Sequence, residues 1–347
     1  MSRRVAVLMS GGVDSSVAAL LLLESGCSVT GVTIKHLSGP QTNAVDQARS
    51  IAESLGIPHR ILDLSEEFDI SIVKPFIARY GEGITPNPCV RCNRMIKFGL
   101  AFSKVRRMGI DHLATGHYAR LLPTEGGVGL FRATDLSKDQ SYFLYAVPPG
   151  TLERVMFPVG EMTKEEVRGR ASEAGLSIPR ASESRDICFA VGSDYRHLIN
   201  REEKPGRFVH IDGRALGFHK GVSHYTIGQR KGLNLGGGGE VFYVTGIDPG
   251  SSTVYVGPRR ALEETFLTAE DAAFLAPVEV DMPVEVKVRS QMEPQPARIE
   301  SLGPDSIGIR FKGPQTAVTP GQSAVLYVAG RVVAGGVIAR KPVPSSC

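Results

Sequence analysis

The stretch VAVLMSGGVDSSVAALLLLESG, residues 5–26, decides the fold. An apolar run from Val5 to Met9 indicates a buried strand, and a Ser-Gly-Gly turn then leads into a helix that begins near Asp14. A helix N-terminus offers unpaired backbone N–H groups, and glycines at 11 and 12 let an anion approach them closely. The junction therefore predicts a phosphate site, with a tight turn that binds no nucleotide as the alternative. It is neither a Walker A nor a Rossmann G-x-G-x-x-G pattern.

Strand and helix patterns alternate from this junction to about residue 115. The expected strands are 5–9, 28–34, 60–64 and 112–115, and the expected helices are 14–25, 43–55, 65–80 and 93–108. Thr163 and Glu166 form a capping-box pattern for a helix to about Ala174, and Ser193 would cap another. The βαβα order predicts an α/β fold with a doubly wound parallel sheet, in a catalytic domain of residues 1–205.

The sequence changes character after Pro205, where short β-rich runs are separated by turns such as 211–213 and 247–250. We expect a small β-rich central domain at 206–265. From about residue 277, about six short strands predict a C-terminal β-barrel, in a domain of residues 266–347. The Gly236–Gly239 run is interpreted as a flexible loop or lid.

Composition and charge limit the class of protein. The chain has 347 residues, 42% hydrophobic content and a net charge of +4, which suits a globular protein of two or three domains. No apolar run is long enough for a signal peptide or a membrane span, so we expect a cytoplasmic protein without a membrane partner. Residues 206–262 carry seven Lys or Arg against three acids. This excess suits an RNA backbone, although a solvated charged surface would show it too.

Five cysteines are present. Cys89 and Cys92 form a Cys-x-x-Cys step near the start of an expected helix, Cys188 lies in SESRDICFA, and Cys27 and Cys347 are interpreted as packing or incidental. The spacing alone leaves open a structural metal clip, a redox disulfide, half of an iron–sulfur site and sulfur-transfer chemistry. Two separate thiol sites suit an oxygen-to-sulfur exchange, because one thiolate carries the sulfur and the other releases it.

Several segments together resemble one known family. They are SGGVDSS (10–16), TPNPCVRCNRMIKFG (85–99), ATGHYAR (114–120), KDQSYFLY (138–145), DICF (186–189), HYTIGQRKGL (224–233) and TPGQSAVLY (319–327). The first resembles the pyrophosphatase loop of the N-type ATP pyrophosphatases. Taken in order along nearly the whole chain, they resemble the bacterial tRNA-specific 2-thiouridylases. This implies an adenine nucleotide hydrolase-like domain in an enzyme, a tRNA-uridine 2-sulfurtransferase, that uses ATP with Mg²⁺ to make 2-thiouridine at wobble position 34 of the tRNAs for Lys, Glu and Gln.

The resemblance also implies roles for single residues. ATP would be bound by Leu8, Met9, Ser10, Gly11, Gly12, Val13, Asp14, Ser15, Ile34 and Gly116. The target base would meet Asn87, Pro88 and Cys89, and the anticodon stem-loop of the tRNA would meet His117, Lys138, Asp139, Gln140, Arg289, Ser290 and Gln322. Four of these residues have plainer interpretations. Asp14 could be a helix N-terminal acid instead of a magnesium or ribose contact, His117 a core histidine, and Lys138 with Asp139 an exposed ion pair.

The implied mechanism divides the work between two catalytic cysteines. Uridine O2 attacks the α-phosphate of ATP, pyrophosphate leaves, and the persulfide sulfur of Cys188 attacks the adenylated C2. Cys188 would receive that sulfur from a sulfur-relay protein or a cysteine desulfurase. Cys92 would either release hydrosulfide from the persulfide or form a disulfide with Cys188 after transfer. The uridine must leave the anticodon stack for this chemistry, and no DNA partner is expected.

One position departs from the family pattern. The resemblance implies an aspartate for acid–base catalysis three residues before the nucleophile, where this chain has Cys89. Cys89, Cys92 and Cys188 could therefore hold three irons of a [4Fe-4S] cluster. A zinc site with His219 and His224 is interpreted as a chance match, because the gap crosses a domain boundary. Another ATP-pyrophosphatase enzyme, such as an amidating synthetase or a different tRNA thiolase, and a non-enzymatic RNA-binding protein are the alternative functions.

Overall fold

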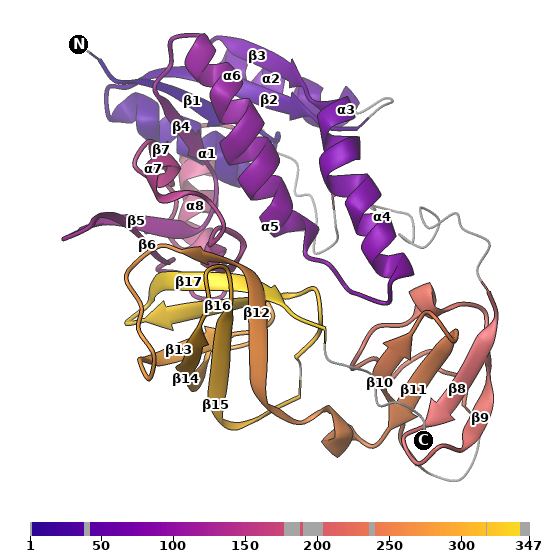
Figure 1. Cartoon of the computed structure of the whole chain (residues 1–347). Helices are drawn as coiled ribbons and strands as arrows, with labels where there is room; N and C mark the ends of the chain where they lie inside the picture. The colour runs from indigo at the N-terminus through magenta and orange to yellow at the C-terminus, as the bar shows by residue number, and fades with distance from the viewer. Residues whose placement is uncertain are drawn as a thin grey trace.

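A computed structural model describes residues 2–37, 42–176, 188–189, 204–235, 240–316 and 318–340. Figure 1 shows a layered α/β part, a small central sheet and a β-barrel. The expected cap at Ser193 and the Gly236–Gly239 run lie outside the described residues. Within those residues, no helix combines the length and the apolar character needed to cross a membrane.

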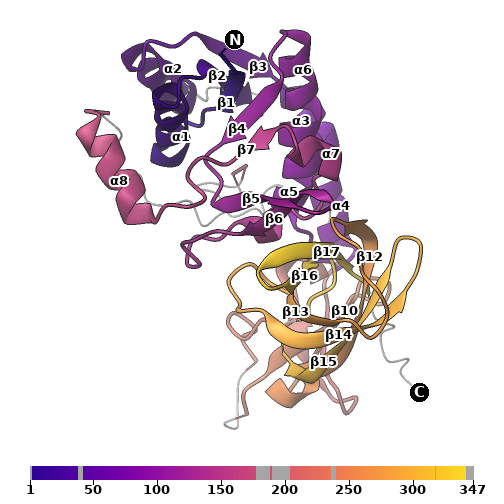
Figure 2. The ribbon, with the colours of Figure 1, turned by 90° about the vertical axis from the view of Figure 1, so that its left-hand side faces the viewer.

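The first sheet is parallel, with the strand order β3-β2-β1-β4-β7. Its strands are β1 (Arg4–Leu8), β2 (Ser28–Lys35), β3 (His59–Asp63), β4 (His112–Thr115) and β7 (Val155–Met156). The helices around it are α1 (Val13–Glu24), α2 (Thr42–Ser54), α3 (Ser65–Phe68), η1 (Asp69–Val73), α4 (Lys74–Gly81), α7 (Pro149–Leu152) and α8 (Lys164–Glu173). In Figure 2, α1, α2 and α8 lie on one side of the sheet, and α3, α4 and α6 (Phe102–Arg107) lie on the other. The predicted doubly wound sheet is confirmed.

Each face of this sheet has its own buried core, because successive side chains of β1 point in opposite directions. Val5 and Val7 pack with residues of α1, α2 and α8. Ala6 packs on the other face with aromatic residues such as Phe68, Phe76 and Phe102. Strands that are apolar on both faces are typical of a covered parallel sheet.

The helix that carries the Cys-x-x-Cys step begins earlier than predicted. It runs without a break through α5 (Pro88–Cys92), a π-helical stretch η2 (Asn93–Ala101) and α6 (Phe102–Arg107). The Asn87 side chain caps it by accepting a hydrogen bond from the Val90 N–H at 3.4 Å. Pro88 is the first helical residue, where its missing N–H leaves no bond unmade. The predicted start at Asn93 was wrong because Asn87-Pro88 is a cap, not part of a loop.

The predicted capping box at the start of α8 is confirmed. The Thr163 N–H donates to Glu166 Oε2 at 2.7 Å, and the Glu166 N–H donates to Thr163 Oγ1 at 3.2 Å. Two orphan N–H groups of the helix start are thereby satisfied. The helix ends at Glu173, next to the predicted end at Ala174.

The central sheet has the order β10-β11-β8-β9. Its strands are β8 (Gly206–His210), β9 (Ala215–His219), β10 (Tyr243–Asp248) and β11 (Thr253–Gly257), with short helices η5 (Val222–His224) and η6 (Arg259–Leu262). The predicted turns join β8 to β9 and β10 to β11. A small core of six buried apolar side chains, including Phe208 and Val254, covers one face of the sheet.

The predicted C-terminal barrel is confirmed, but it begins earlier. Its strands are β12 (Glu264–Phe274), β13 (Pro283–Lys287), β14 (Gln295–Leu302), β15 (Ile307–Gln315), β16 (Ser323–Val328) and β17 (Arg331–Ile338), and β12 pairs with β17 to close it. Residues 278–280, expected as a strand, form none. The sequence pattern missed β12 because the polar pair Glu270–Asp271 and a bulge interrupt its alternation.

A hairpin from the first part of the chain reaches the barrel. It consists of β5 (Ala119–Thr124) and β6 (Gly127–Arg132), and β6 pairs with β17 at Phe131 and Arg331. The short helix η3 (Ser141–Phe143) follows. Figure 1 shows the hairpin lying directly against β17. This hairpin was not predicted, and it connects the α/β part to the barrel.

Candidate active site

The predicted phosphate-binding turn lies between the end of β1 at Leu8 and the start of α1 at Val13. Gly11 has a φ of +78°, and a Cβ there would lie 2.9 Å from the Ala44 carbonyl oxygen. Gly12 is the N-cap and offers the helix no side-chain hydrogen bond. The Ser10 N–H donates to Ser15 Oγ at 3.2 Å, which ties the turn to the helix. Because no capping side chain covers the first N–H groups of α1, the turn fits a phosphate.

Asp14 takes part in an ion pair that the sequence did not reveal. Lys164, at the start of α8, places Nζ 2.6 Å and 2.8 Å from the two carboxylate oxygens of Asp14. The Tyr118 hydroxyl donates to the same carboxylate at 2.8 Å. The Lys164 side chain is only 12% exposed. Asp14 is therefore more than an unpaired acid at a helix N-terminus, and Lys164 places a cation beside the turn. A magnesium or ribose contact by Asp14 stays a prediction.

The other residues predicted to bind nucleotide lie at the same edge of the sheet. Met9 donates its N–H to the Val32 carbonyl at 2.8 Å, and Ile34 stands near the end of β2, against the core. Gly116 follows β4, where a Cβ would lie 2.6 Å from backbone atoms of Asp14 and Ser15. Only glycine allows this approach. Ligands of open parallel sheets bind at this carboxyl edge.

Three free cysteines from two segments come together near this edge. Cys89 and Cys92 lie in α5, and Cys188 directly precedes the buried Phe189. The Phe189 ring packs edge-on against Phe76, with centroids 5.1 Å apart, and also against Phe68 at 5.9 Å. These aromatic contacts fix Cys188 over α3 and α4.

The pKa values of all three thiols are raised by burial. Burial, and then the charges of Cys92 and Cys89, raise the pKa of Cys188 to about 12. Burial also raises the pKa of Cys89 and of Cys92. Cys89 and Cys188 are nevertheless exposed residues. A thiol that is exposed to solvent yet largely surrounded by protein atoms lies in a concave part of the surface. Such a position suits a reactive group that must contact a substrate.

Lys97 is a candidate functional residue that the sequence analysis missed. Its charge lowers the pKa of all three thiols. No carboxylate among the described residues forms an ion pair with it. It lies in the π-helical stretch η2, and such stretches are frequent at functional sites. The signal available in the sequence was its place in the NPCVRCNRMIK segment, five residues after Cys92.

His117 links Lys97 to the nucleotide edge. Its Nε2 lies 3.5 Å from Lys97 Nζ, and its Nδ1 lies 2.7 Å from Thr115 Oγ1. Burial and the Lys97 charge hold the pKa of His117 well below its ordinary value. Because an ammonium only donates, the neutral ring accepts at Nε2 and donates from Nδ1. The plainer interpretation as an internally satisfied histidine fits these contacts, and an RNA contact by His117 stays a prediction.

The residues predicted as metal ligands do not form a ligand set. In the part of the chain that the structure describes, no three His, Cys, Asp or Glu side chains are placed to hold a metal ion. This applies to Cys89, Cys92 and Cys188, expected as iron ligands, and to the cysteine pair with His219 and His224. Among the described residues, the predictions of a [4Fe-4S] cluster and of a zinc site therefore have no support.

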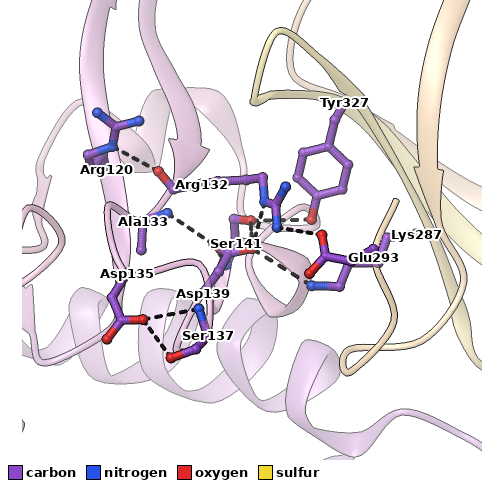
Figure 3. A network of polar contacts seen from close by, with 10 residues as sticks. All are labelled: Arg120, Arg132, Ala133, Asp135, Ser137, Asp139, Ser141, Lys287, Glu293 and Tyr327. Atoms are coloured by element: carbon purple, nitrogen blue, oxygen red, sulfur yellow. Dashed lines mark hydrogen bonds and ion pairs between the residues drawn. The ribbon is translucent and has the colours of Figure 1, made fainter. Parts of the chain in front are cut away.

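Asp139 is a buried anchor between the α/β part and the barrel (Figure 3). Its side chain is 0% exposed, and its Oδ2 lies 3.5 Å from Arg132 Nε and 3.9 Å from Lys287 Nζ. The N–H groups of Ala133 and Ser141 each donate to Oδ1 at 3.1 Å. The interpretation as an exposed ion pair with Lys138 was wrong, because Asp139 is not exposed. Its carboxylate cannot reach a bound RNA in this conformation.

The remaining residues predicted to contact tRNA lie where the three parts meet. Gln140 exchanges two hydrogen bonds with the Tyr118 backbone, at 2.7 Å and 3.0 Å. Gln322 donates to the Thr85 carbonyl at 3.0 Å, just before Asn87. Arg289 donates to Thr319 Oγ1 at 2.7 Å and to the Ile227 carbonyl at 3.4 Å. Lys138 and Ser290 are half-buried beside these contacts.

A pocket of about 550 Å³ opens beside Asn87 and Pro88, between α4, α5 and the barrel. Its charged lining residues are Arg79, Arg91, Arg94, Arg340, Glu270 and Asp271. Four arginines against two acids favour an anionic ligand. The segment predicted to meet the target base thus borders an opening with charged residues in a partly apolar lining.

Comparisons with known proteins agree along the whole chain. The family model described as a tRNA methyl transferase HUP domain matches residues 3–192, a tRNA methyl transferase PRC-barrel domain matches 197–258, and an aminomethyltransferase beta-barrel domain matches 264–338. A solved 4-thiouridine synthetase–RNA complex is 20% identical, with a TM-score of 0.34 over 50% of this chain and 41% of that chain, which is too distant to carry an argument.

Two curated relatives match over almost their full lengths. The tRNA-specific 2-thiouridylase MnmA of Chloroflexus aurantiacus is 44% identical over 98% of this chain and 99% of its own. The enzyme of the same name from Thermus thermophilus is 44% identical over 97% of this chain and 95% of its own. Since three family models match in order and these relatives match end to end, the chain belongs to the tRNA-specific 2-thiouridylase family.

Proposed function

We propose that the chain catalyses the ATP-dependent 2-thiolation of uridine at wobble position 34 of the tRNAs for Lys, Glu and Gln. The observation that supports this most is the meeting of Cys92 and Cys188, two free thiols from separate segments, with Lys97. Through His117, Lys97 is linked to Gly116, which touches the phosphate-binding turn. The phosphate site would serve the activation of the uridine oxygen by ATP, and the paired thiols next to it would serve the transfer of sulfur.

The Leu8–Ser15 turn would bind the phosphates of ATP. Its helix N-terminus and the nearby Lys164 are suited to hold the negative charge of the leaving pyrophosphate. Mg²⁺, entering with the phosphates, would supply further neutralisation of that charge. Attack of uridine O2 on the α-phosphorus forms the O2–P bond and breaks the bond to pyrophosphate, which leaves C2 with AMP as its leaving group.

The two cysteines would then transfer the sulfur. A sulfur-relay protein or a cysteine desulfurase leaves a terminal sulfur on Cys188 as a persulfide. In one route that sulfur bonds to C2 as AMP leaves, and the Cys92 thiolate attacks the Cys188 sulfur, which gives 2-thiouridine and a Cys92–Cys188 disulfide. In the other, Cys92 attacks first and releases hydrosulfide, which then attacks C2. Either route ends in a disulfide that a cellular dithiol must reduce.

Cys89 occupies the position of the expected aspartate. Burial raises the pKa of its thiol, so at neutral pH it is protonated and cannot serve as the proton acceptor that an aspartate would supply. The described residues show no metal-ligand set that includes the three cysteines, so the thiols themselves carry each proposed step. Free thiols of this kind are maintained in the reducing cytoplasm, where we place the reaction.

The test is a thiolation assay with purified chain, an unmodified tRNA transcript for Glu, ATP and a persulfide donor. We expect 2-thiouridine in the product, detected by retardation in a mercury-containing gel, together with release of AMP and pyrophosphate. Cys188→Ala should abolish thiolation and keep ATP binding. Cys27→Ala is the matched control, because Cys27 is also free but packs against the α1 and α2 core. Full activity of Cys188→Ala would refute the sulfur-transfer role.

A further inference from the structure

We propose that the outer face of the central sheet binds an unpaired nucleotide of the RNA, with Phe218 as the platform on which its base stacks. This inference rests on the proposed function, because tRNA is the RNA in question. It goes further in assigning a binding site on β9, a strand that contains none of the residues so far predicted to contact RNA.

Phe218 is exposed to a degree that packing does not explain. It is 78% exposed, more than the other large apolar side chains that lie on the surface of the described residues. It stands in β9, which is an edge strand of the central sheet. Figure 1 shows this strand on the side of the central part that points away from the barrel. Single exposed apolar side chains are common on protein surfaces, so the groups around this ring decide whether a partner covers it.

The strand register places a cation beside the ring. Arg207 of β8 is the cross-strand partner of Phe218, and Thr253 of β11 is the partner of Arg207. The guanidinium carbon of Arg207 lies 5.8 Å from the centre of the Phe218 ring, within the range of a cation–π contact. The neighbouring strand residues Phe208 and Val254 point into the core instead. The outer face thus presents an aromatic ring and a cation together.

The charge around this face favours RNA as the partner. The segment 206–262 has seven basic residues against three acids. Of the acids, Asp212 already pairs with Arg214 at 2.8 Å, and Asp248 accepts from Ser251 at 2.7 Å. Arg207, the cross-strand partner of Phe218, and Lys220, two residues after it in the chain, form no ion pair with a described residue. Free cations suit phosphates, which an apolar protein partner would not supply.

An exposed aromatic ring on a sheet, with arginine next to it, is the arrangement by which proteins hold single-stranded nucleotides. The base stacks on the ring and the cation binds the phosphate, with little dependence on which base is present. The tRNA offers such bases in its loops. We therefore infer that Phe218 and Arg207 hold one loop nucleotide while the target uridine lies in the active site.

The composition of the chain allows a direct test. It has no tryptophan, so Phe218→Trp introduces a single fluorescent reporter at the proposed platform. We expect an unmodified tRNA transcript for Glu to quench this fluorescence as it binds. Val280→Trp is the control, because Val280 is likewise an exposed apolar residue, at 50%, but lies between β12 and β13 of the barrel. Its fluorescence should change little.

Binding affinities give the second readout. Phe218→Ala should weaken tRNA binding roughly 5- to 150-fold, the range for one lost base stack, while Phe218→Trp should preserve it. Arg207→Gln should lower the salt dependence of binding by about one unit of slope. Unchanged affinity of Phe218→Ala, or equal quenching at both tryptophans, would overturn the proposal. A chain that shows the quenching but makes no 2-thiouridine would instead refute the proposed function alone.

Discussion

Asp139→Asn should destabilise the protein substantially, because it removes one charge from a buried group. The side chains of Asp139 and Lys287 are 0% and 4% exposed, and burial already lowers the pKa of Lys287 despite the nearby carboxylate. Breaking a buried pair costs about 3–5 kcal/mol. We expect the lower end, about 3 kcal/mol, because the ion-pair distances are long and asparagine keeps an acceptor for the Ala133 and Ser141 N–H groups.

Thermal unfolding followed by calorimetry measures this effect. A loss of about 3 kcal/mol corresponds to roughly 6–12 °C in the midpoint for a unit of 150–250 residues. The double variant Asp139→Asn, Lys287→Met should recover at least half of it, since the buried Lys287 charge is removed as well and Arg132 keeps its ion pair with Glu293. Without Asp139, the folded pKa of Lys287 falls further below its unfolded value, so the unfolded state binds more protons and stability should rise with pH.

A different outcome would show that the Asp139 carboxylate contacts RNA. If Asp139→Asn leaves the unfolding midpoint within about 2 °C but weakens tRNA binding, the carboxylate is an RNA contact and the burial argument is wrong. Lys138→Ala serves as the matched variant for that comparison, because it changes the adjacent, half-exposed residue.

Three further predictions concern the active site. Lys97→Met should move the pH profile of Cys188 alkylation to higher pH, with a rate at fixed pH that falls about tenfold per pKa unit, and it should slow thiolation. Lys97→Arg should keep both the profile and the thiolation rate. An unchanged profile in Lys97→Met would argue against the role of Lys97. With its pKa at about 12, Cys188 should react with iodoacetamide at a rate that still rises at pH 10, and a plateau near pH 9 would contradict this. Gly116→Ala should raise the Kd for ATP at least tenfold, because its Cβ would lie 2.6 Å from the backbone at the start of α1; Gly150→Ala, with open space around it, should bind ATP normally.

Local patterns allowed much of the fold to be predicted. The Thr163 and Glu166 capping box needs only neighbouring residues, and it appears as expected. The meeting of the 8–15 turn with Ile34 and Gly116 follows from topology, because parallel strands bring their carboxyl ends to one edge. Where the alternation of apolar and polar residues was interrupted, as in β12, the strand was not predicted.

Pairs between distant segments could not be predicted in this way. Asp14 and Lys164 are 150 residues apart, and their ion pair leaves no periodic trace in the sequence. The direction of Lys97 depends on the π-helical stretch η2, since a residue five positions after Cys92 points elsewhere on an α-helix. Both pairings require the tertiary structure, which is why two cations of the candidate site were missed.

The barrel also contacts the segment that leads into the candidate active site, through a residue that was predicted to bind tRNA. Gln322 uses its amide to hold the Thr85 carbonyl at 3.0 Å, and a Cβ on Gly321 would lie 2.8 Å from the same oxygen. The amide would gain little by exchanging this bond for one of equal strength to RNA. A residue that matches a family's RNA contacts can therefore act by positioning the segment predicted to meet the base. This segment leads into Asn87 and the helix of Cys89 and Cys92, so the Gln322 contact ties the barrel to the start of that helix.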